Sequence, residues 1–379
     1  MKLELIGPND ENGLRDWDAF LMESLRGHYA LLSTWLRSYV PYGFDFNILA
    51  ARNPEDGAIA GGIGLLNLGN RLLFKIVTAP VGPIVEVGFE SLAGPIMRAA
   101  VEHARNSGAA LLQLRYPCAA DGTLAALLSV DALPVLTHAR VGAAFDVGNA
   151  PAQMLWVGFP EATDQATWRD QLFRRFEPQT RNKIRIGERQ GLEVYEAKTE
   201  TELREAYSIM EVEALNRGAA FRSWNDFGSI LLEQVERGQA MLVAVRHQGR
   251  VIASRYGLLA GRRFSYIAGA RVPVDKLKVG QYLTWAVMEK ARDRGLIGYD
   301  FTSIGDPGVM RFKDGFRPQH INLVAPQYLV FSAIRHGAFE LLYRRLRKHR
   351  FGVSRVLSAV HRSIHRRVQS KKAPGGFGN

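Results

Sequence analysis

The stretch AMLVAVRHQGRVIASRYGLLAGRRFSYIAG, residues 240–269, decides the fold that this sequence predicts. Its segments are rich in apolar, β-branched and aromatic residues, and a turn at His247-Gln248-Gly249-Arg250 separates the first two. A helical stretch follows that contains Glu289-x-Ala291-Arg292-x-x-Gly295, and then the strand-like segment IGYDFTSIGD at 297–306. The predicted order is three strands, one helix and a fourth strand.

Residues 46–117 repeat this order. FNILAARNPEDGAIAGGIGLLNLGNRLLFKI at 46–76 predicts three strands, with a turn at Pro54-Glu55-Asp56-Gly57. A helical stretch with Glu102-x-Ala104-Arg105-x-x-Gly108 and the strand AALLQLRYP complete the unit. Because both helices end in Gly at the same place before the next strand, an internal duplication is favoured over two unrelated units.

The expected fold class is therefore α/β, with two similar units. We place the domain change near Gly148 to Pro151, which gives a first domain at 1–150 and a second at 151–330, followed by a tail at 331–379. A chain of 379 residues with 47% hydrophobic residues is ordinary for two globular domains.

Composition also bears on location. No run approaches the roughly 18 apolar residues of a membrane span, and the start MKLELIGPNDENG carries acids where a signal peptide has cations. The single cysteine, Cys118, excludes an internal disulfide and fits a reducing compartment. We therefore expect a cytoplasmic protein. No metal-ligand set, cofactor motif or Ser/His/Asp group is evident, so we expect no metal and no cofactor.

Nearly all of the net charge of +12 lies in the tail, where residues 331–379 hold twelve Lys or Arg and one acid, Glu340. Apolar residues at helical spacing, flanked by arginines, predict a basic amphipathic helix from Val353 to Val368. Such a helix can dock on its own protein, lie on an anionic membrane through residues 352–372, or follow RNA phosphates. A membrane contact would place the protein at the inner face of the membrane.

The stretch YDFTSIGDPGVMRFKDGF, residues 299–316, carries the best indication of function. It predicts a strand ending in Asp300, a loop rich in Gly, Pro and Asp, and then Arg311, Phe312 and Lys313. A cation between aromatic residues in such a loop can approach an anionic ligand. Asp300 is either a base, an anchor for an amine, or a former of the turn.

Further candidates lie between and within the two units. A helix from Trp168 ends before Pro178, and a second helix carries Arg181, Lys183 and Arg185 before Gly191. These cations form either a solvated face or a phosphate-binding face. Tyr256 and Tyr266, on strands of the second unit, either face a cleft or pack in the core.

Several motifs in order resemble one known family. They are Arg181-Asn-Lys183-Ile-Arg185 through Gly191, Asn216-Arg217-Gly218-x-x-Phe221, VGQYLTWAVMEKARDRG at 279–295, Tyr299-Asp300-Phe301, and Phe312-Lys313-x-Gly315-Phe316. This order is similar to that of the FemABX aminoacyltransferases, over roughly residues 25–330. The resemblance implies two tandem GNAT-like acyltransferase domains, with mixed sheets flanked by helices. It also implies transfer of an amino acid from aminoacyl-tRNA to an amine, typically on the peptide stem of a cell-wall precursor.

The resemblance assigns roles to residues. Phe312 and Lys313 would lie at the channel that receives the charged tRNA end, with Lys313 facing phosphate or the developing oxyanion. Arg217 and Phe221, four residues apart on one helical face, would line the acceptor cleft. The family's phosphate-gripping lysine has no counterpart near Trp35 to Pro41, where Arg37 is the nearest cation. The acceptor, a lipid-linked or a nucleotide-linked precursor, therefore stays open.

The donor has to be argued separately, because GNAT enzymes that use coenzyme A share the fold. They bind pyrophosphate with Gln/Arg-x-x-Gly-x-Gly/Ala before a helix, whereas Leu277-Lys278-Val279-Gly280-Gln281-Tyr282 lacks the first and last of these residues. This favours aminoacyl-tRNA. Two alternatives remain: an N-acyltransferase that uses acyl-CoA or acyl carrier protein in envelope or polysaccharide synthesis, and a non-catalytic membrane-associated scaffold.

Overall fold

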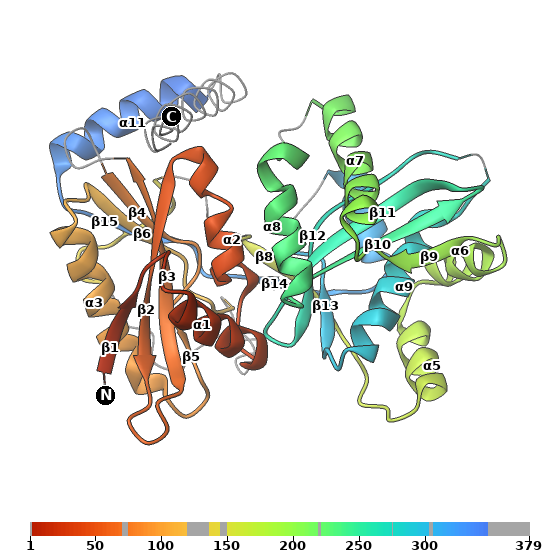
Figure 1. Cartoon of the computed structure of the whole chain (residues 1–379), viewed down its shortest axis with the longest axis horizontal. Coiled ribbons are helices and arrows are strands. Elements are labelled where there is room, and N and C mark those ends of the chain that lie inside the picture. Colours follow the sequence, from red (N-terminus) through yellow and green to blue (C-terminus); the bar gives the residue numbers. More distant parts are fainter. Residues whose placement is uncertain are drawn as a thin grey trace, which may run out of the picture.

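A computed structural model describes residues 2–69, 75–119, 136–144, 150–218, 221–274, 276–302 and 306–347. Two mixed β-sheets lie side by side, and helices cover the faces of each (Figure 1). The helix predicted from Val353 to Val368 lies outside the described residues. No helix within the described ranges is both long enough and apolar enough to cross a membrane.

The first sheet has the order β1-β2-β3-β4-β6-β15-β7, with β5 paired to β3. Its strands are β1 (Lys2–Ile6), β2 (Phe44–Arg52), β3 (Ile59–Gly69), β4 (Lys75–Ala79), β5 (Ile84–Val85), β6 (Leu111–Leu114), β7 (Arg140–Val141) and β15 (Gln327–Val330). The helices of this part are α1 (Glu11–Glu23), α2 (Ser33–Arg37), α3 (Ala93–Asn106) and α11 (Ala333–Arg347), with short 3-10 helices η1 (Tyr29–Leu31), η2 (Val40–Tyr42) and η3 (Glu90–Leu92).

The second sheet has the order β9-β10-β11-β12-β13-β8-β14. Its strands are β8 (Gln153–Gly158), β9 (Glu193–Glu196), β10 (Ala240–His247), β11 (Arg250–Ala260), β12 (Arg263–Arg271), β13 (Gly298–Asp300) and β14 (Gln319–Asn322). The helices are α5 (Gln165–Arg175), α6 (Pro178–Glu188), α7 (Glu200–Asn216), α8 (Trp224–Glu236), α9 (Val279–Asp293) and α10 (Pro307–Asp314).

The two sheets confirm the duplication. β4 and β6 are parallel and are joined by α3, and β12 and β13 are parallel and are joined by α9. The strands that precede them, β2-β3 and β10-β11, are antiparallel in both units. The glycines that follow α3 and α9 are both left-handed, with φ of 76° at Gly108 and 73° at Gly295. This backbone conformation ends a helix and favours glycine.

One strand position is exchanged between the units. β8 follows the first unit in the sequence but pairs with β13 and β14 of the second sheet. β15 follows the second unit in the sequence but pairs with β6 and β7 of the first sheet. The chain therefore crosses between the sheets twice, and α11 continues from β15 over the first unit (Figure 1).

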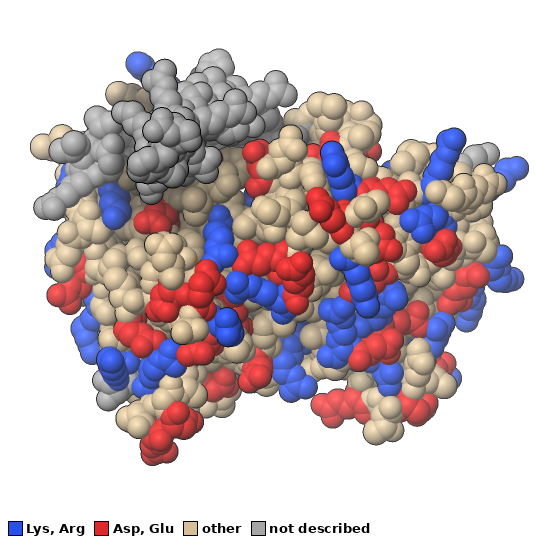
Figure 2. Space-filling model, viewed as in Figure 1, with Lys and Arg blue, Asp and Glu red and all other residues tan. Residues whose placement is uncertain are grey.

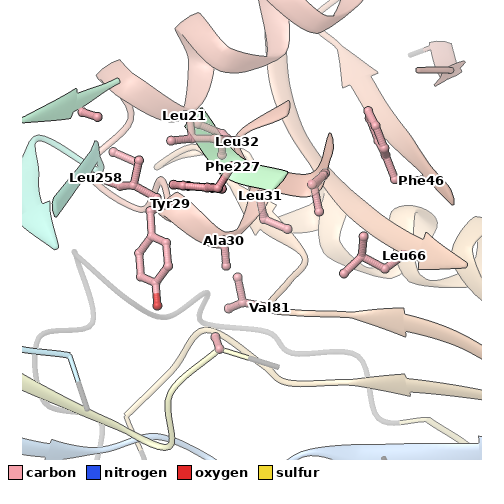
Figure 3. Packing of buried hydrophobic residues seen from close by; sticks show 14 of the residues in the cluster. Leu21, Tyr29, Ala30, Leu31, Leu32, Phe46, Leu66, Val81, Phe227 and Leu258 are labelled. Atoms are coloured by element: carbon pink, nitrogen blue, oxygen red, sulfur yellow. The ribbon is translucent and has the colours of Figure 1, made fainter. Parts of the chain in front are cut away.

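One hydrophobic cluster spans the two units, and each unit also has a cluster of its own. α3 covers one face of the first sheet, where Ile96 and Met97 pack with Val77 and Leu112. The opposite face contributes to a cluster that also includes residues of α8 and of the second sheet. Figure 3 shows this junction, with side chains from both units: Leu31, Leu32, Phe46, Leu66, Phe227 and Leu258. Burial of such side chains is the main force that holds the units together.

A tight backbone contact fixes how the units meet. The N–H of Gly261, in the turn between β11 and β12, donates to the Leu21 carbonyl at 2.9 Å. The buried guanidinium of Arg263 donates to the carbonyls of Leu25 at 3.2 Å and Gly27 at 2.8 Å. An added Cβ at Gly261 would lie 2.3 Å from the carbonyl oxygen of Gly27, so the turn needs glycine here.

We predict that Gly261→Ala lowers the free energy of unfolding by about 2–4 kcal/mol, because the new methyl group meets backbone and φ is +63°. Urea unfolding measures the effect. Gly249→Ala is the matched control, since Gly249 also has a positive φ of 74° but nothing within 4 Å of the added carbon. Its loss should stay at about 1–2 kcal/mol, the cost of the left-handed conformation alone. Equal losses in the two variants would contradict the tight contact.

Candidate active site

The candidate site lies where β12 and β13 part. These parallel strands pair from Arg263 and Gly298 to Ser265 and Asp300, where β13 ends although β12 continues to Arg271. Just beyond, the Thr302 hydroxyl donates to the Tyr266 carbonyl at 2.6 Å. The residues that follow the last strand pair therefore lie at what we call the opening between β12 and β13, meaning the place where their strand pairing ends.

Asp300 is the last residue of β13, and its side chain is 6% exposed. Its Oδ1 accepts hydrogen bonds from the N–H groups of Leu155 at 3.1 Å and Thr302 at 2.7 Å. Burial raises the pKa of Asp300 to about 6, against the opposing effect of these hydrogen bonds and of the cations Arg263 and Lys313. The carboxyl group is thus both a turn former and a group that titrates near neutral pH.

Lys313 lies on α10, which corrects the expectation of a loop. Asp306 caps this helix by accepting from the N–H groups of Gly308 and Val309, both at 2.9 Å, and Pro307 occupies the first helical position. The side chain of Lys313 is 3% exposed. The helix therefore directs the lysine inward, toward the end of β13.

The surroundings of the Lys313 ammonium also differ from the prediction. Its Nζ donates to the Phe301 carbonyl at 3.0 Å and lies 5.8 Å from the centre of the Tyr266 ring. Phe312 and Phe316, expected on either side of it, contact each other with ring centres 5.6 Å apart. Burial lowers the pKa of Lys313 to about 8, which Asp300 opposes and Arg255 reinforces. The lysine remains mostly cationic at pH 7.

Arg255 is a site residue that the sequence reasoning missed. Its buried guanidinium lies over the rings of Tyr266 at 5.0 Å and Phe312 at 5.6 Å, and it donates to the Tyr299 hydroxyl at 3.4 Å. Among the described residues, its buried Nε has no hydrogen-bond partner. The sequence did contain a feature that could have indicated Arg255, namely a cation inside the otherwise apolar strand Arg250–Ala260.

Tyr256 and Tyr266 lie on opposite faces of the second sheet. Tyr266 belongs to the face that packs against α9 and α10, next to Lys313. Tyr256 belongs to the face that packs against α7 and α8, and its buried hydroxyl donates to Gln234 Oε1 at 2.6 Å. Successive strand residues alternate between faces, so Arg255 and Tyr256 are separated in the same way.

Arg217 and Phe221 do not share a helical face, which corrects another expectation. α7 ends at Asn216, and Gly218 has a left-handed φ of 62°. Arg217 is exposed and pairs with Glu213 at 2.6 Å. Phe221 turns back onto α7, where its ring centre lies 5.2 Å from that of Tyr207. The two residues are therefore not one combined binding surface.

The start of α6, the helix that carries three of the candidate cations, lies beside the end of α10. Glu177 directly precedes α6, and Gly315 directly follows α10. The N–H of Glu177 donates to the Gly315 carbonyl at 3.0 Å. Arg181 donates to the Arg174 carbonyl at 3.2 Å, and Arg185 lies 5.1 Å above the Phe173 ring. Lys183 is half-buried and Arg311, on α10, is exposed. Figure 2 shows that cations and anions are interspersed on the face in view rather than gathered in one patch.

The start of α9 is already engaged by other parts of the protein. The Lys278 N–H donates to Gln190 Oε1 at 2.9 Å, and Gln190 Nε2 donates to the Lys276 carbonyl at 2.9 Å. Gly280 lies against Phe312, and Tyr282 packs on Gly187 of α6. Among the described residues, no group of three His, Cys, Asp or Glu side chains could hold a metal ion.

Comparison with known proteins agrees with this architecture. Residues 174–314 match the family of the acetyltransferase (GNAT) domain. The crystal structure of FemX superposes with a TM-score of 0.72 at 16% identity, covering 90% of this chain and 100% of FemX. L-PGS from Bacillus licheniformis gives a TM-score of 0.51 at 14% identity, covering 90% of this chain and 98% of the other. No curated protein sequence matches the chain.

A third similar structure is the C-terminal domain of a putative lysylphosphatidylglycerol synthetase from Agrobacterium fabrum. Its TM-score is 0.50 at 12% identity, covering 88% of this chain and 96% of that domain. Residues 174–314 therefore match an acetyltransferase (GNAT) domain, and the similarity to the three structures concerns the fold. More particularly, the fold of this chain is the tandem GNAT fold of FemX, as the motifs and the duplication predicted.

The buried carboxyl group should make stability depend on pH. Asp300 has a pKa near 3.9 in an unfolded chain and about 6 in the folded state, so folding favours its protonated form. Its stabilising contribution is complete below pH 4 and is lost as the pH rises through 6. Relative to Asp300→Asn, the wild type should lose about 2–3 kcal/mol of unfolding free energy between pH 4 and 6.

Chemical unfolding at several pH values measures this difference, with Asp293→Asn as the control at an exposed acid. A flat difference between the wild type and Asp300→Asn over this range would contradict the burial of the carboxyl group.

Proposed function

We propose that this protein is an aminoacyltransferase that moves an amino acid from aminoacyl-tRNA to an amine. The observation that carries the proposal is the pair of Lys313 and Asp300 at the opening between β12 and β13. The fold of FemX and the similarity to a lysylphosphatidylglycerol synthetase domain support it. The name of the latter describes a product that carries a lysyl group.

The reaction needs few catalytic groups from the protein, because the donor ester is already activated. The acceptor nitrogen forms a bond to the ester carbonyl carbon, the carbonyl oxygen becomes an oxyanion, and the bond to the tRNA ribose oxygen breaks. The released ribose oxygen takes up a proton, so the products are an amide and uncharged tRNA. Positioning and stabilisation of the oxyanion supply most of the acceleration in such a reaction.

The two central side chains take separate roles in this proposal. The Lys313 ammonium, held by the Phe301 carbonyl, faces the developing oxyanion or a phosphate of the donor. The Asp300 carboxylate takes the proton from the acceptor ammonium. Both hydrogen bonds from neighbouring N–H groups reach its Oδ1, which leaves Oδ2 for this task. The rings of Phe312 and Tyr266, which lie beside Arg255 and Lys313, would limit the access of water in this proposal.

The cations on α6 and α10 suit a polynucleotide donor. Arg181, Lys183 and Arg185 lie on α6, which begins beside the end of α10, and Arg311 is exposed on α10 itself. Lys and Arg side chains of this kind bind the phosphates of RNA through charge. We propose that they receive the acceptor end of tRNA.

The start of α9 argues against acyl-CoA as the donor. In coenzyme A enzymes of this fold, free N–H groups at the helix start hold the pyrophosphate. Here Gln190 occupies the Lys278 N–H, and Tyr282 fills space beside α6. Acyl-CoA therefore serves as the comparison donor in the tests below.

We place the reaction in the cytoplasm and propose that the amine belongs to a precursor of the cell envelope. The basic tail would hold the protein at the inner face of the membrane through residues 352–372. This part of the proposal rests on the charge of the sequence.

We predict that Lys313→Ala lowers the rate of transfer by about 30- to 1000-fold, since one charge-assisted contact to an oxyanion contributes roughly 2–4 kcal/mol. The assay incubates the protein with a labelled pool of aminoacyl-tRNA and envelope-precursor amines, and in parallel with acyl-CoA. Lys198→Ala, at an exposed lysine before α7, is the matched control. Wild-type turnover by folded Lys313→Ala, or transfer from acyl-CoA alone, would refute the assignment.

The α6 cations should bind tRNA in a salt-sensitive manner. We predict that replacing Arg181, Lys183 and Arg185 together with Gln weakens tRNA binding and reduces the slope of log K against log salt by about 2. Filter binding at 50–200 mM salt measures it, with Arg204→Gln on α7 as the control. A protein truncated after Phe351 is tested alongside. If only the truncation changes the slope, the tail and not α6 contacts the tRNA.

A further inference from the structure

The helix α11 presents an apolar face to the outside of the protein. The side chains of Ile334, Leu341 and Leu342 are 88%, 60% and 45% exposed. Their spacing of i, i+7 and i+8 places them on one side of the helix, and Ala338, also exposed, lies between them on that side. α11 thus carries three of the ten large apolar residues that are exposed in the described part of the chain. Single apolar residues on a surface are ordinary, whereas a group of them marks a surface for a partner.

The opposite side of α11 is packed on the first unit. His336 and Phe339 are buried. The ring of His336 stacks on that of Tyr328, on β15, with centres 5.8 Å apart, and Phe339 belongs to the cluster that spans the two units. At the start of the helix, Arg335 donates to the Gly108 carbonyl at 3.0 Å. These contacts fix the orientation of α11, so its apolar face cannot turn inward without breaking them.

The duplication provides a comparison for α11 within the same molecule. Gly158 of the exchanged strand β8 lies opposite Gly298, and Val330 of the exchanged strand β15 lies opposite Leu111. Gly298 and Leu111 are each the third residue after the glycine that ends the helix of their unit. Gly158 and Val330 are therefore equivalent positions, and α5 and α11 are the helices that follow them.

These two equivalent helices differ on their exposed sides. α5 packs Trp168 and Leu172 inward, and its exposed residues include Asp170, Gln171 and Arg174. No large apolar residue of α5, which the structure describes throughout, is exposed. Contact of apolar side chains with water is unfavourable in free energy. The apolar outer face is therefore particular to α11 and does not follow from this position in the fold.

The charge around α11 favours an anionic partner. Residues 331–379 hold twelve Lys or Arg and one acid, Glu340. Arg345 and Arg347 are exposed at the end of α11, and Arg140 is exposed on β7, the strand that pairs with β15. Exposed Ile and Leu next to arginines are typical of a helix that lies in the interface of an anionic bilayer. RNA would contact the arginines through its phosphates but would leave the apolar residues in water.

The segment that follows α11 is a poor cover for its apolar face. Residues 348–379 hold eight Lys or Arg and no acid. Packing this segment on α11 would bring like charges together, which is unfavourable. An anionic surface would instead attract both segments at once.

We propose that the exposed face of α11 lies in the interface of an anionic phospholipid bilayer. Ile334, Leu341 and Leu342 would lie among the acyl chains, and Arg345 would contact the headgroup phosphates. The inference rests on the membrane contact in the proposed function and deepens it, because it assigns that contact to α11 in addition to residues 352–372. α11 lies over the first unit, and α6 lies on the far side of the second (Figure 1). A bilayer against α11 therefore leaves the α6 cations free for tRNA.

An environment-sensitive dye on the full-length protein tests the contact directly. The single cysteine, Cys118, is buried, so the dye can be attached at an introduced surface cysteine. We expect the fluorescence of an NBD group on Leu341→Cys to rise at least twofold with phosphatidylcholine vesicles that contain one third phosphatidylglycerol. Leu215→Cys, at a residue of α7 that is 71% exposed, is the matched control and should not respond.

Vesicle flotation then separates the contribution of α11 from that of the tail. Replacing Ile334 and Leu341 together with Ser should weaken binding to these vesicles at least tenfold, both in the full chain and in protein truncated after Phe351. The matched control replaces Val212 and Leu215 of α7, which are 57% and 71% exposed, with Ser and should leave binding unchanged. Circular dichroism confirms that the variants are folded.

Three outcomes would overturn the inference. They are no dye response of Leu341→Cys to the vesicles, unchanged vesicle binding after replacement of Ile334 and Leu341, and a dye response to tRNA or to added unlabelled protein in place of vesicles. The last outcome would assign the face to RNA or to a second copy of the chain.

None of these measurements uses a transfer reaction, so the two proposals fail separately. A protein that transfers from aminoacyl-tRNA but gives no response to vesicles would refute the membrane face alone. A protein that binds vesicles through α11 but transfers nothing would refute the transferase and leave the membrane face.

Discussion

The buried guanidinium of Arg263 fixes the first unit directly beside the candidate site. A charge in this position is tolerated only when it is paired and hydrogen-bonded, and the carbonyls of Leu25 and Gly27 in the first unit supply those bonds. The same charge favours ionisation of Asp300. One side chain thus joins the two units and adjusts the carboxyl group of the candidate site, so the geometry of the joint and the chemistry of the site are linked.

The duplicated units have kept one topology but differ where the chemistry is proposed. Gln113 lies five residues after Gly108, and Asp300 lies five residues after Gly295, so they occupy equivalent places on β6 and β13. Thr78 pairs with Gln113 as Ser265 pairs with Asp300. Since an amide cannot accept a proton as a carboxylate does, the first unit lacks the base. The exchanged strands do not account for this difference, because β15 pairs alongside β6 as β8 pairs alongside β13.

Local patterns in the sequence predicted much of this fold, because strand alternation and helix-ending glycines act within short segments. The exchange of β8 and β15 was not predictable, since strands of both sheets offer similar apolar edges and only the packed core selects between them. α10 could have been found, because Asp306 followed by Pro307 is a helix start, yet the adjacent glycines favoured a loop. Arg222 and aromatic residues that it contacts, such as Trp35, come from segments far apart in the sequence. No sequence spacing therefore predicts their contact.

The two faces of the second sheet offer different environments. One face carries the buried Lys313 and the α6 cations, and the other carries rings around a single guanidinium. An intact sheet would separate them, because its backbone groups are all paired. The pairing of β12 with β13 ends at Ser265 and Asp300, and directly after it the Lys313 ammonium of α10 donates to the Phe301 carbonyl. On this reasoning, the place where β12 and β13 stop pairing sets the position of the proposed reaction. The side chains around it then adjust the pKa values of Asp300 and Lys313.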